Sequence, residues 1–244
     1  MIEYNSNSII YIKNINMNKR IQAAFLIVMI IIFAGCYSHQ NLKPNEVAIG
    51  KQIWLKKNLN VNKFRNGEII PEAKIDEEWL KANKNEKPVW CYYDFDSTND
   101  ELYGKLYNWY AVNDSRILAP EGYHIPSIFE WQKLDKYLGE KESAIKMKSN
   151  SGWKKGTKND NESGFSGLPG GYYGIGLDKN FHMKGGRGAW WSSTKEAPNL
   201  ALEDDEPFIV KYVSLEEIYP RFFCGLPSNP NKDASGFSIR CIKD

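Results

Sequence analysis

Residues 119–138 read APEGYHIPSIFEWQKLDKYL, and this stretch decides how the rest of the chain folds. Ser127 has the identity of a helix N-cap, and Glu130 three residues later completes an S-x-x-E capping box. Behind this cap, apolar residues recur at spacings of three and four, as on one face of a helix: Ile128, Trp131, Leu134 and Leu138. The stretch therefore predicts a helix of about three turns whose Trp-bearing face packs onto the core.

Other patterns predict the elements on either side of this helix. Residues Leu102–Val112, LYGKLYNWYAV, carry aromatic and apolar side chains at helical spacing, which predicts a second main helix buried on most sides. Apolar residues on both sides of Gly50 predict a pair of strands. Short helices are expected at Asp76–Ala82 and Glu142–Lys148, and strands at Val89–Tyr93, Ala189–Thr194, Pro207–Ser214 and Gly236–Ile242.

Residues 151–188 contain eleven glycines among 38 residues and show little periodicity. This predicts a long irregular region, of a kind that is usually functional or irregularly packed. Trp190 and Trp191 follow it on an expected strand. Because neighbouring strand residues point to opposite faces, one indole should face the core and the other should face outward or into the loop layer.

Composition excludes some partners. The 244 residues include 32 Lys and Arg against 30 Asp and Glu, a formal net charge of +2, and no regularly spaced basic stripe that would predict nucleic-acid binding. Eight Trp, fourteen Tyr and eleven Phe make the chain rich in aromatic residues. We expect these rings to form an aromatic core rather than a binding platform.

The N-terminal region predicts a lipoprotein signal peptide over residues 17–35. A basic segment, Asn18–Arg20, precedes the apolar run Ala23–Phe33, which is too short for a transmembrane span of about 20 residues. The run is followed by Ala34-Gly35-Cys36, which resembles the lipobox of bacterial lipoproteins. This resemblance implies cleavage before Cys36 and a diacylglycerol thioether on its sulfur. An ordinary secretory signal or a short buried helix is the alternative.

This interpretation divides the chain into four parts. Residues 1–16 are expected to be a mis-assigned extension before a translation start at Met17, and residues 17–35 are the signal peptide. Residues 36–46 are then the lipidated cysteine and its tether, and residues 47–244 are the folded domain. The lipid bilayer is then a partner through the Cys36 acyl anchor. Surface-exported lipoproteins of Bacteroidetes typically carry acidic residues directly after the cysteine, whereas the first acid here is Glu46. We therefore expect an outer membrane lipoprotein that faces the periplasm.

The remaining cysteines and the histidines predict no metal site. Their spacings match no paired zinc pattern: Cys91, Cys224 and Cys241, with His39, His124 and His182. His124 precedes the core helix, where a buried, hydrogen-bonded structural histidine is expected. Three body cysteines in an oxidising periplasm would leave an odd thiol or an intermolecular bond.

Six stretches together resemble the Fibrobacter succinogenes major paralogous domain, found in lipoproteins and secreted proteins of Bacteroidetes and Fibrobacteres. The resemblance covers about residues 47–244. It implies an α+β, C-type-lectin-like domain with two main helices, short antiparallel strands and a long glycine-rich loop region. The family has no established catalytic residues, so none is assigned here. The stretches are IGKQIWLKKNL from Ile49, YGKLYNWYAV from Tyr103, PEGYHIPSIFEW from Pro120, GFSGLPGGY from Gly164, WWSST from Trp190 and GFSIRC from Gly236.

The resemblance also bears on disulfide pairing. The family often has cysteine where this chain has Ala119, and it keeps the last-strand cysteine, Cys241. If those two normally form a bridge, Cys241 has lost its partner in this chain. A Cys224–Cys241 bridge is then one candidate, and Cys91 is the other possible partner.

The function implied is non-enzymatic binding or scaffolding of a glycan or protein, without a cofactor. Candidate ligand contacts are the aromatic rings and one cation in the glycine-rich region and the strand that follows it. Irregular core packing would equally explain the aromatic residues of the loop. The candidate residues are Tyr172, Tyr173, Phe181, Arg187 and Trp191.

Two other functions are weighed against this one. Formylglycine-generating and sulfoxide-synthase-like enzymes share the fold class, and residues 122–131 are similar to their R-L-P-T-E-x-E-W motif. A copper thiolate pair at Cys224 and Cys241 would support such a cofactor-dependent enzyme, the alternative function. Calcium-dependent sugar binding is less favoured, because the sequence at 196–199, EAPN, breaks the lectin Glu-Pro-Asn spacing.

Overall fold

A computed structural model describes residues 42–174, 180–197 and 208–244. The expected signal peptide, Cys36 and most of its tether lie outside these residues, as does the sequence between 198 and 207. Within the described residues, each helix is too short or too polar to cross a membrane. The described part of the chain is an α+β domain with antiparallel sheets.

The core helix is confirmed. Helix α5 spans Ile128–Leu138, and the capping box is complete, because Ser127 and Glu130 each accept a hydrogen bond from the other's backbone N–H. The four apolar residues predicted to face the core are all buried. Gly139 ends the helix with a left-handed φ of 93°, a conformation that glycine adopts without steric cost.

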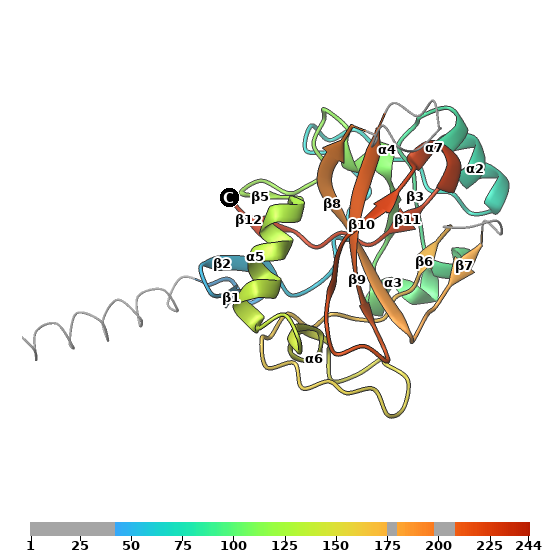
Figure 1. Ribbon diagram of the computed structural model, residues 1–244. Helices are drawn as coiled ribbons and strands as arrows, with labels where there is room; N and C mark the ends of the chain where they lie inside the picture. Colours follow the sequence, from blue (N-terminus) through green and yellow to red (C-terminus); the bar gives the residue numbers. More distant parts are fainter. Residues whose placement is uncertain (1–41, 175–179, 198–207) are drawn as a thin grey trace, which may run out of the picture. The chain divides into compact units, whose positions relative to one another are not determined.

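Helix α5 covers one face of a three-stranded sheet that lies at the centre of the domain (Figure 1). Its strands are β8 Arg187–Glu196, β9 Ile209–Glu216 and β10 Phe223–Ser228, in the order β10-β9-β8. Trp190 of β8 lies on the α5 side, with its ring 6.4 Å from that of Trp131. Trp191 packs on the other face, 4.4 Å from Phe237. The two indoles point to opposite faces as expected. Neither faces outward, because β8 separates two parts of the core and both rings are fully buried.

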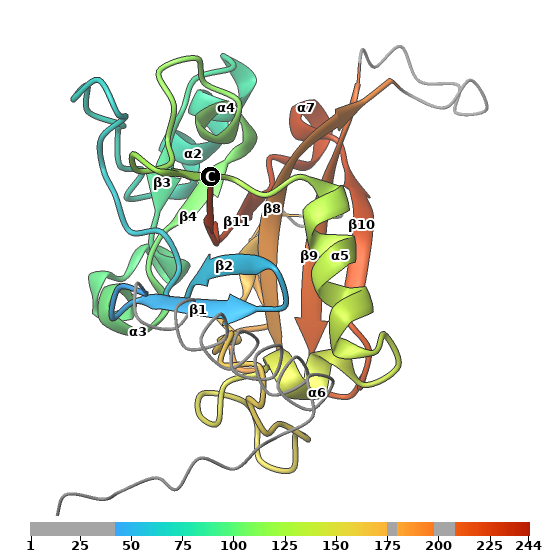
Figure 2. The ribbon, with the colours of Figure 1, turned by 90° about the vertical axis from the view of Figure 1, so that its left-hand side faces the viewer.

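A four-stranded sheet joins the two ends of the domain (Figure 2). The predicted pair around Gly50 is confirmed as a hairpin, and Gly50 has a positive φ of 61°. The C-terminal strand pairs between this hairpin and the segment that enters α5. The sheet order is β1 Glu46–Ile49, β2 Gln52–Leu55, β12 Ile242–Lys243 and β5 Tyr123–His124.

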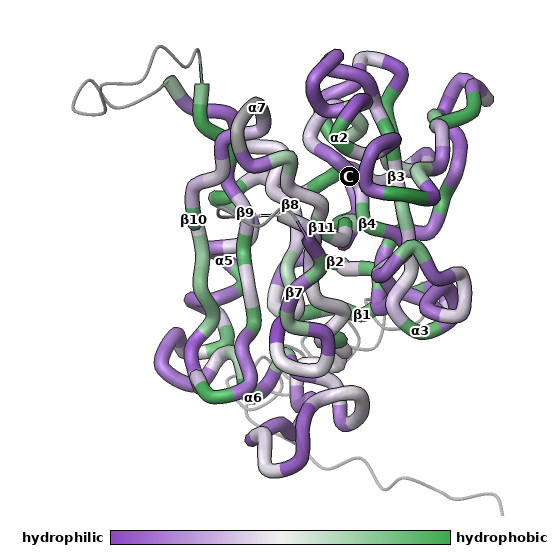
Figure 3. The backbone as a smooth tube through the Cα atoms, turned by 90° about the vertical axis from the view of Figure 1, so that its right-hand side faces the viewer, coloured by the Kyte–Doolittle hydropathy of each residue, from purple (hydrophilic) through white to green (hydrophobic). Residues whose placement is uncertain are grey.

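A five-stranded sheet closes the other side of the core (Figure 3). Its order is β3 Trp90–Cys91, β4 Leu106–Asn108, β11 Gly236–Phe237, β6 Tyr172–Tyr173 and β7 Phe181–His182. The expected strand 236–242 is thus split between two sheets. Between its halves, Ser238 pairs with β8 and the Arg240 side chain is fully buried, so both residues expected to alternate outward point inward.

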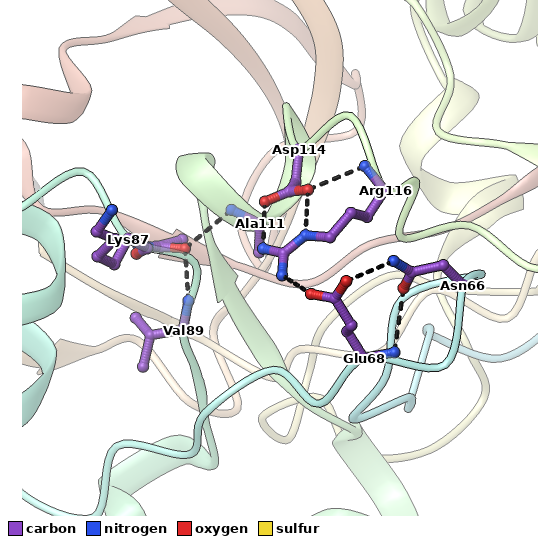
Figure 4. Close-up of polar contacts among 8 residues, drawn as sticks. Asn66, Glu68, Lys87, Val89, Ala111, Asp114 and Arg116 are labelled. Atoms are coloured by element: carbon purple, nitrogen blue, oxygen red, sulfur yellow. Dashed lines mark hydrogen bonds and ion pairs between the residues drawn. The ribbon is translucent and has the colours of Figure 1, made fainter.

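The expected second main helix over Leu102–Val112 is wrong. This stretch forms a short helix α3, strand β4 and a short helix α4. Gly104 adopts φ 71° and ψ −153°, which breaks the helix. Asn108 then caps α4: its Oδ1 accepts from Ala111 N at 3.1 Å and from Val89 N at 3.0 Å (Figure 4). The helices are α2 Asp76–Lys84, α3 Asp100–Tyr103, α4 Trp109–Val112, α5, α6 Ser143–Met147 and α7 Pro230–Asp233.

A closed ion-pair network holds the segment after α4 to the loop that precedes α2 (Figure 4). Arg116 donates through Nε and Nη2 to the two oxygens of Asp114, at 2.8 and 2.7 Å, and through Nη1 to Glu68 at 2.5 Å. Hydrogen bonds from Arg116 lower the pKa of both carboxyl groups. Because Arg116 bonds to carboxylates of both segments, we assign the network a structural role.

Candidate functional site

A pocket of about 600 Å³ opens beside α6, within the roughly 300–1,000 Å³ range of small-molecule sites. Three segments contribute to its lining: residues 142–148 at α6, residues 154–158 of the glycine-rich region, and residues 217–220 between β9 and β10. Four of its lining residues are lysines, so we refer to it as the lysine pocket.

Close backbone packing positions Lys148, which follows α6. Gly167 N donates to Met147 O at 2.8 Å, and Ser149 N donates to Gly167 O at 2.9 Å. A Cβ on Gly167 would lie 2.6 Å from the Leu215 side chain, so a larger residue at this position would displace Gly167 from Met147 and Ser149. The absence of a side chain at Gly167 therefore permits the backbone hydrogen bonds on either side of Lys148.

Backbone hydrogen bonds also fix the other two segments of the pocket. Lys154 N donates to Gly185 O at 3.0 Å, and Glu217 N donates to Gly186 O at 2.8 Å. Ala144 N in α6 donates to Pro220 O at 3.0 Å. The pocket thus joins segments more than 60 residues apart in the sequence into one framework.

Lys148 is buried, with 1% of its surface exposed. Its Nζ donates to Tyr219 O at 2.9 Å and to Glu217 O at 3.4 Å, and it lies 5.3 Å from the centre of the Trp153 ring. Burial lowers the pKa of Lys148 to about 8, although nearby Glu216 and Glu217 oppose the shift. A buried ammonium held by neutral carbonyls favours the approach of a negative charge.

The other lysines make the pocket cationic. Lys154 forms an ion pair with Glu217 at 3.2 Å, whereas Lys155 and Lys158 are exposed and form no ion pair within the described residues. The four lining lysines exceed the two lining glutamates by two charges. Sequence analysis missed this site, although the closely spaced lysines at 154, 155 and 158 were a visible signal.

A second pocket, of about 700 Å³, lies between residues 57–60 and 98–104. Its polar groups bond largely with the protein itself. Asn60 Nδ2 donates to Asp100 Oδ1 at 2.6 Å, and Asn58 Oδ1 accepts from both Trp190 and Arg240. The lysine pocket therefore leaves more charged groups available to a ligand and is the stronger candidate.

The five residues predicted to contact a ligand do not form an exposed platform. Trp191 and Tyr173 are fully buried, with Trp191 Nε1 donating to Tyr107 O at 2.7 Å. The structure does bring Tyr172 and Arg187 together, with the guanidinium 5.3 Å from the ring centre, but Tyr172 is also buried. Phe181 is half-buried and packs 5.0 Å from Tyr173. Irregular core packing, the other explanation of the loop aromatics, describes Tyr172, Tyr173 and Phe181.

The candidate Cys224–Cys241 bridge is not formed, because Cys91, Cys224 and Cys241 are all free thiols. Cys241 belongs to the core on the Trp191 side of the central sheet, whereas Cys224 packs on the α5 side. Burial raises the pKa of Cys224 and of Cys241 to about 12, so neither is a thiolate near neutral pH. Across the described ranges, no group of three or more His, Cys, Asp or Glu side chains is arranged to hold a metal ion.

His124 is hydrogen-bonded as expected, but its side chain is 41% exposed rather than buried. The ring contacts Glu130 Oε1 through Nε2 at 2.9 Å and Asp244 Oδ1 through Nδ1 at 2.8 Å. Burial would lower the pKa of His124, but its hydrogen bonds to the two carboxylates outweigh burial and raise it above 6.5. For Glu130, burial would raise the pKa, whereas hydrogen bonds from Ser127 and His124 lower it below 4.5.

We expect this cluster to make stability depend on pH. The contribution of His124 is complete below pH 6.5 and is lost as the pH rises through its raised pKa, whereas that of Glu130 is complete above pH 4.5 and is lost on acidification. Urea unfolding from about pH 5.5 to about pH 8.5 should therefore show wild type losing its advantage over His124→Gln as the pH rises. A difference that stays constant over this range would contradict the assignment.

The comparisons with known proteins identify the domain. The Fibrobacter succinogenes major domain matches residues 47–243, from the first strand of the hairpin to the last strand of the same sheet. No curated protein and no solved structure matches the chain. The resemblance found in the six sequence stretches is thus confirmed, and the chain belongs to the Fibrobacter succinogenes major domain family.

Proposed function

We propose that this protein is a cell-envelope lipoprotein whose C-type-lectin-like domain binds a glycan or a protein and is not an enzyme. The observation that carries the proposal is the lysine pocket, where lysines from two of the three lining segments surround a cavity of ligand size on a framework fixed by backbone hydrogen bonds. Cys224 and Cys241 pack in different parts of the core, which favours binding over copper chemistry at this pair.

Arrays of glycans and peptides test the binding function. Full-length protein purified in a neutral detergent should be retained by a defined class of glycan or peptide. The same ligand added in solution should compete for retention. Retention by none of the probes, with the protein shown to be folded by its unfolding transition, would overturn the proposal.

Cys36→Ser should release the protein from the membrane fraction. The proposed anchor is a lipid on the Cys36 sulfur, and serine has no thiol to form the thioether. Labelling cells with a radioactive fatty acid and separating the membranes measures both effects. Cys224→Ser provides the matched control, because this thiol is half-buried in the domain and should leave labelling unchanged. Persistent lipid labelling of Cys36→Ser would contradict the anchor.

We further propose that the domain faces the periplasm from the outer membrane. The support is the sequence after Cys36, which has no acid before Glu46. Strand β1 begins at Glu46, so the tether has at most nine residues and reaches at most about 30–32 Å, and partners must lie close to the membrane. Protease added to intact cells should leave the protein uncut, and permeabilised cells should lose it. Cleavage in intact cells, with a periplasmic control protected, would place the domain outside.

A further inference from the structure

We propose that the lysine pocket recognises a phosphate monoester, as carried by a phosphorylated sugar or a lipid headgroup. This inference rests on the proposed binding function and names the chemistry of its ligand. The pocket lining has two more lysines than glutamates, and one lysine, Lys154, is already paired with Glu217. A dianionic phosphate would balance the remaining excess of charge.

Lys148 provides the most specific support. An ammonium group has three N–H donors, and within the described residues the Lys148 Nζ has two hydrogen-bond acceptors, both of them backbone carbonyls. No ion pair joins it to a carboxylate in the described part of the chain. A buried ammonium that bonds to no carboxylate directly is costly even with Glu216 and Glu217 nearby, so an anion that accepts from the third donor would be favoured.

The distribution of the lysines favours phosphate over carboxylate. Lys148 lies at the end of α6, whereas Lys155 and Lys158 come from a separate loop, so the cations reach the pocket from different segments. The three terminal oxygens of a phosphate monoester can accept from several donors in different directions, and lysine binds phosphate as a point charge. A carboxylate carries half the charge and has only two oxygens.

The rim of the pocket indicates that the phosphate is attached to a larger group. Ile218 is 73% exposed and Tyr219 is 42% exposed, both at the connection between β9 and β10. The Tyr219 ring is supported by Phe223, with ring centres 5.1 Å apart. An apolar and aromatic surface beside a cationic pocket suits the face of a sugar ring or the glycerol and upper chain of a lipid.

Calorimetric titration of the full-length protein in neutral detergent and phosphate-free buffer tests this inference. Glucose 6-phosphate should bind, and glucose and glucuronate should bind at least about tenfold more weakly, since the loss of even one charge-assisted hydrogen bond weakens binding by about that factor. Dihexanoyl phosphatidic acid gives the lipid arm. Tighter binding of the sugar phosphate or of the lipid identifies the source of the phosphate, and either result supports the inference.

Matched charge reversals separate a specific pocket from general attraction. The double variant Lys155→Glu, Lys158→Glu alters exposed side chains and should weaken glucose 6-phosphate binding by about tenfold or more. The control Lys133→Glu, Lys136→Glu changes the same net charge on exposed positions of α5 and should bind like wild type. Equal losses in both variants would overturn the inference.

Two further results would overturn phosphate recognition but leave the proposed binding function open to test. Equal binding of glucuronate and glucose 6-phosphate would remove the specificity for phosphate. Failure of both phosphate probes, with another class of glycan or peptide retained on the arrays, would reject phosphate recognition alone. Failure of the phosphate probes and of the arrays together would reject the binding function itself.

Discussion

Replacing Arg240 with methionine is expected to lower the free energy of unfolding by about 3–5 kcal/mol. Arg240 is fully buried, and its guanidinium donates to Phe165 O at 2.5 Å, to Leu55 O at 3.2 Å and to Asn58 Oδ1 at 2.8 Å. It therefore joins the hairpin, the glycine-rich region and the C-terminal segment. Methionine fills part of the space but leaves these acceptors without their donor, at about 1–3 kcal/mol for each one left unsatisfied.

Part of this loss is offset, because methionine also removes a buried charge. Burial lowers the pKa of Arg240 to about 9, which shows that the cation is poorly solvated although still protonated at neutral pH. Arg240→Lys should also destabilise the domain, since a single ammonium cannot reproduce the planar arrangement of donors. The exposed Arg221→Met is the control and should lose less than about 1 kcal/mol. A similarly small loss for Arg240→Met in urea unfolding would show that the desolvation cost cancels the hydrogen bonds.

Trp131→Ala is expected to lower the free energy of unfolding by about 3–5 kcal/mol, because it leaves a large cavity beneath α5. Trp131 is fully buried. Its ring centre lies 4.6 Å from that of Trp54, 5.7 Å from that of Phe222 and 5.9 Å from that of Phe165. These partners come from β2, from the connection before β10 and from the glycine-rich region, so the indole fills the space between three parts of the chain.

Two variants make the test of Trp131 specific. Trp131→Phe should lose less than the alanine variant, because it keeps a ring and because the Trp131 Nε1 has no hydrogen-bond partner within the described residues. Phe129→Ala lies two residues away on α5 but is 68% exposed, so its effect should be within about 0.5 kcal/mol. Equal losses for Trp131→Ala and Phe129→Ala would mean that the buried face of α5 is wrongly assigned.

The sequence alone was sufficient where short-range physics decides the structure. The S-x-x-E cap and the apolar spacing behind it predicted α5 and its buried face, because both signals act within one or two helical turns. Gly50 and the apolar residues around it predicted the first hairpin for the same reason. The six ordered stretches also identified the family, since they occur in order along the whole matched region.

The tertiary structure decided what depends on residues far apart in the chain. The aromatic spacing of 102–112 fits a helix, yet Asn108 bonds to Val89 and residues 106–108 are buried as strand β4. One of the neighbouring indoles on β8 was expected to face outward or into the loop layer, but the chain covers both faces of that strand and both rings are buried. Lys148 donates a hydrogen bond to the backbone oxygen of Tyr219, which lies 71 positions later in the sequence. Its place in the pocket depends on how closely Gly167 approaches Leu215, a contact between distant residues that no local pattern encodes.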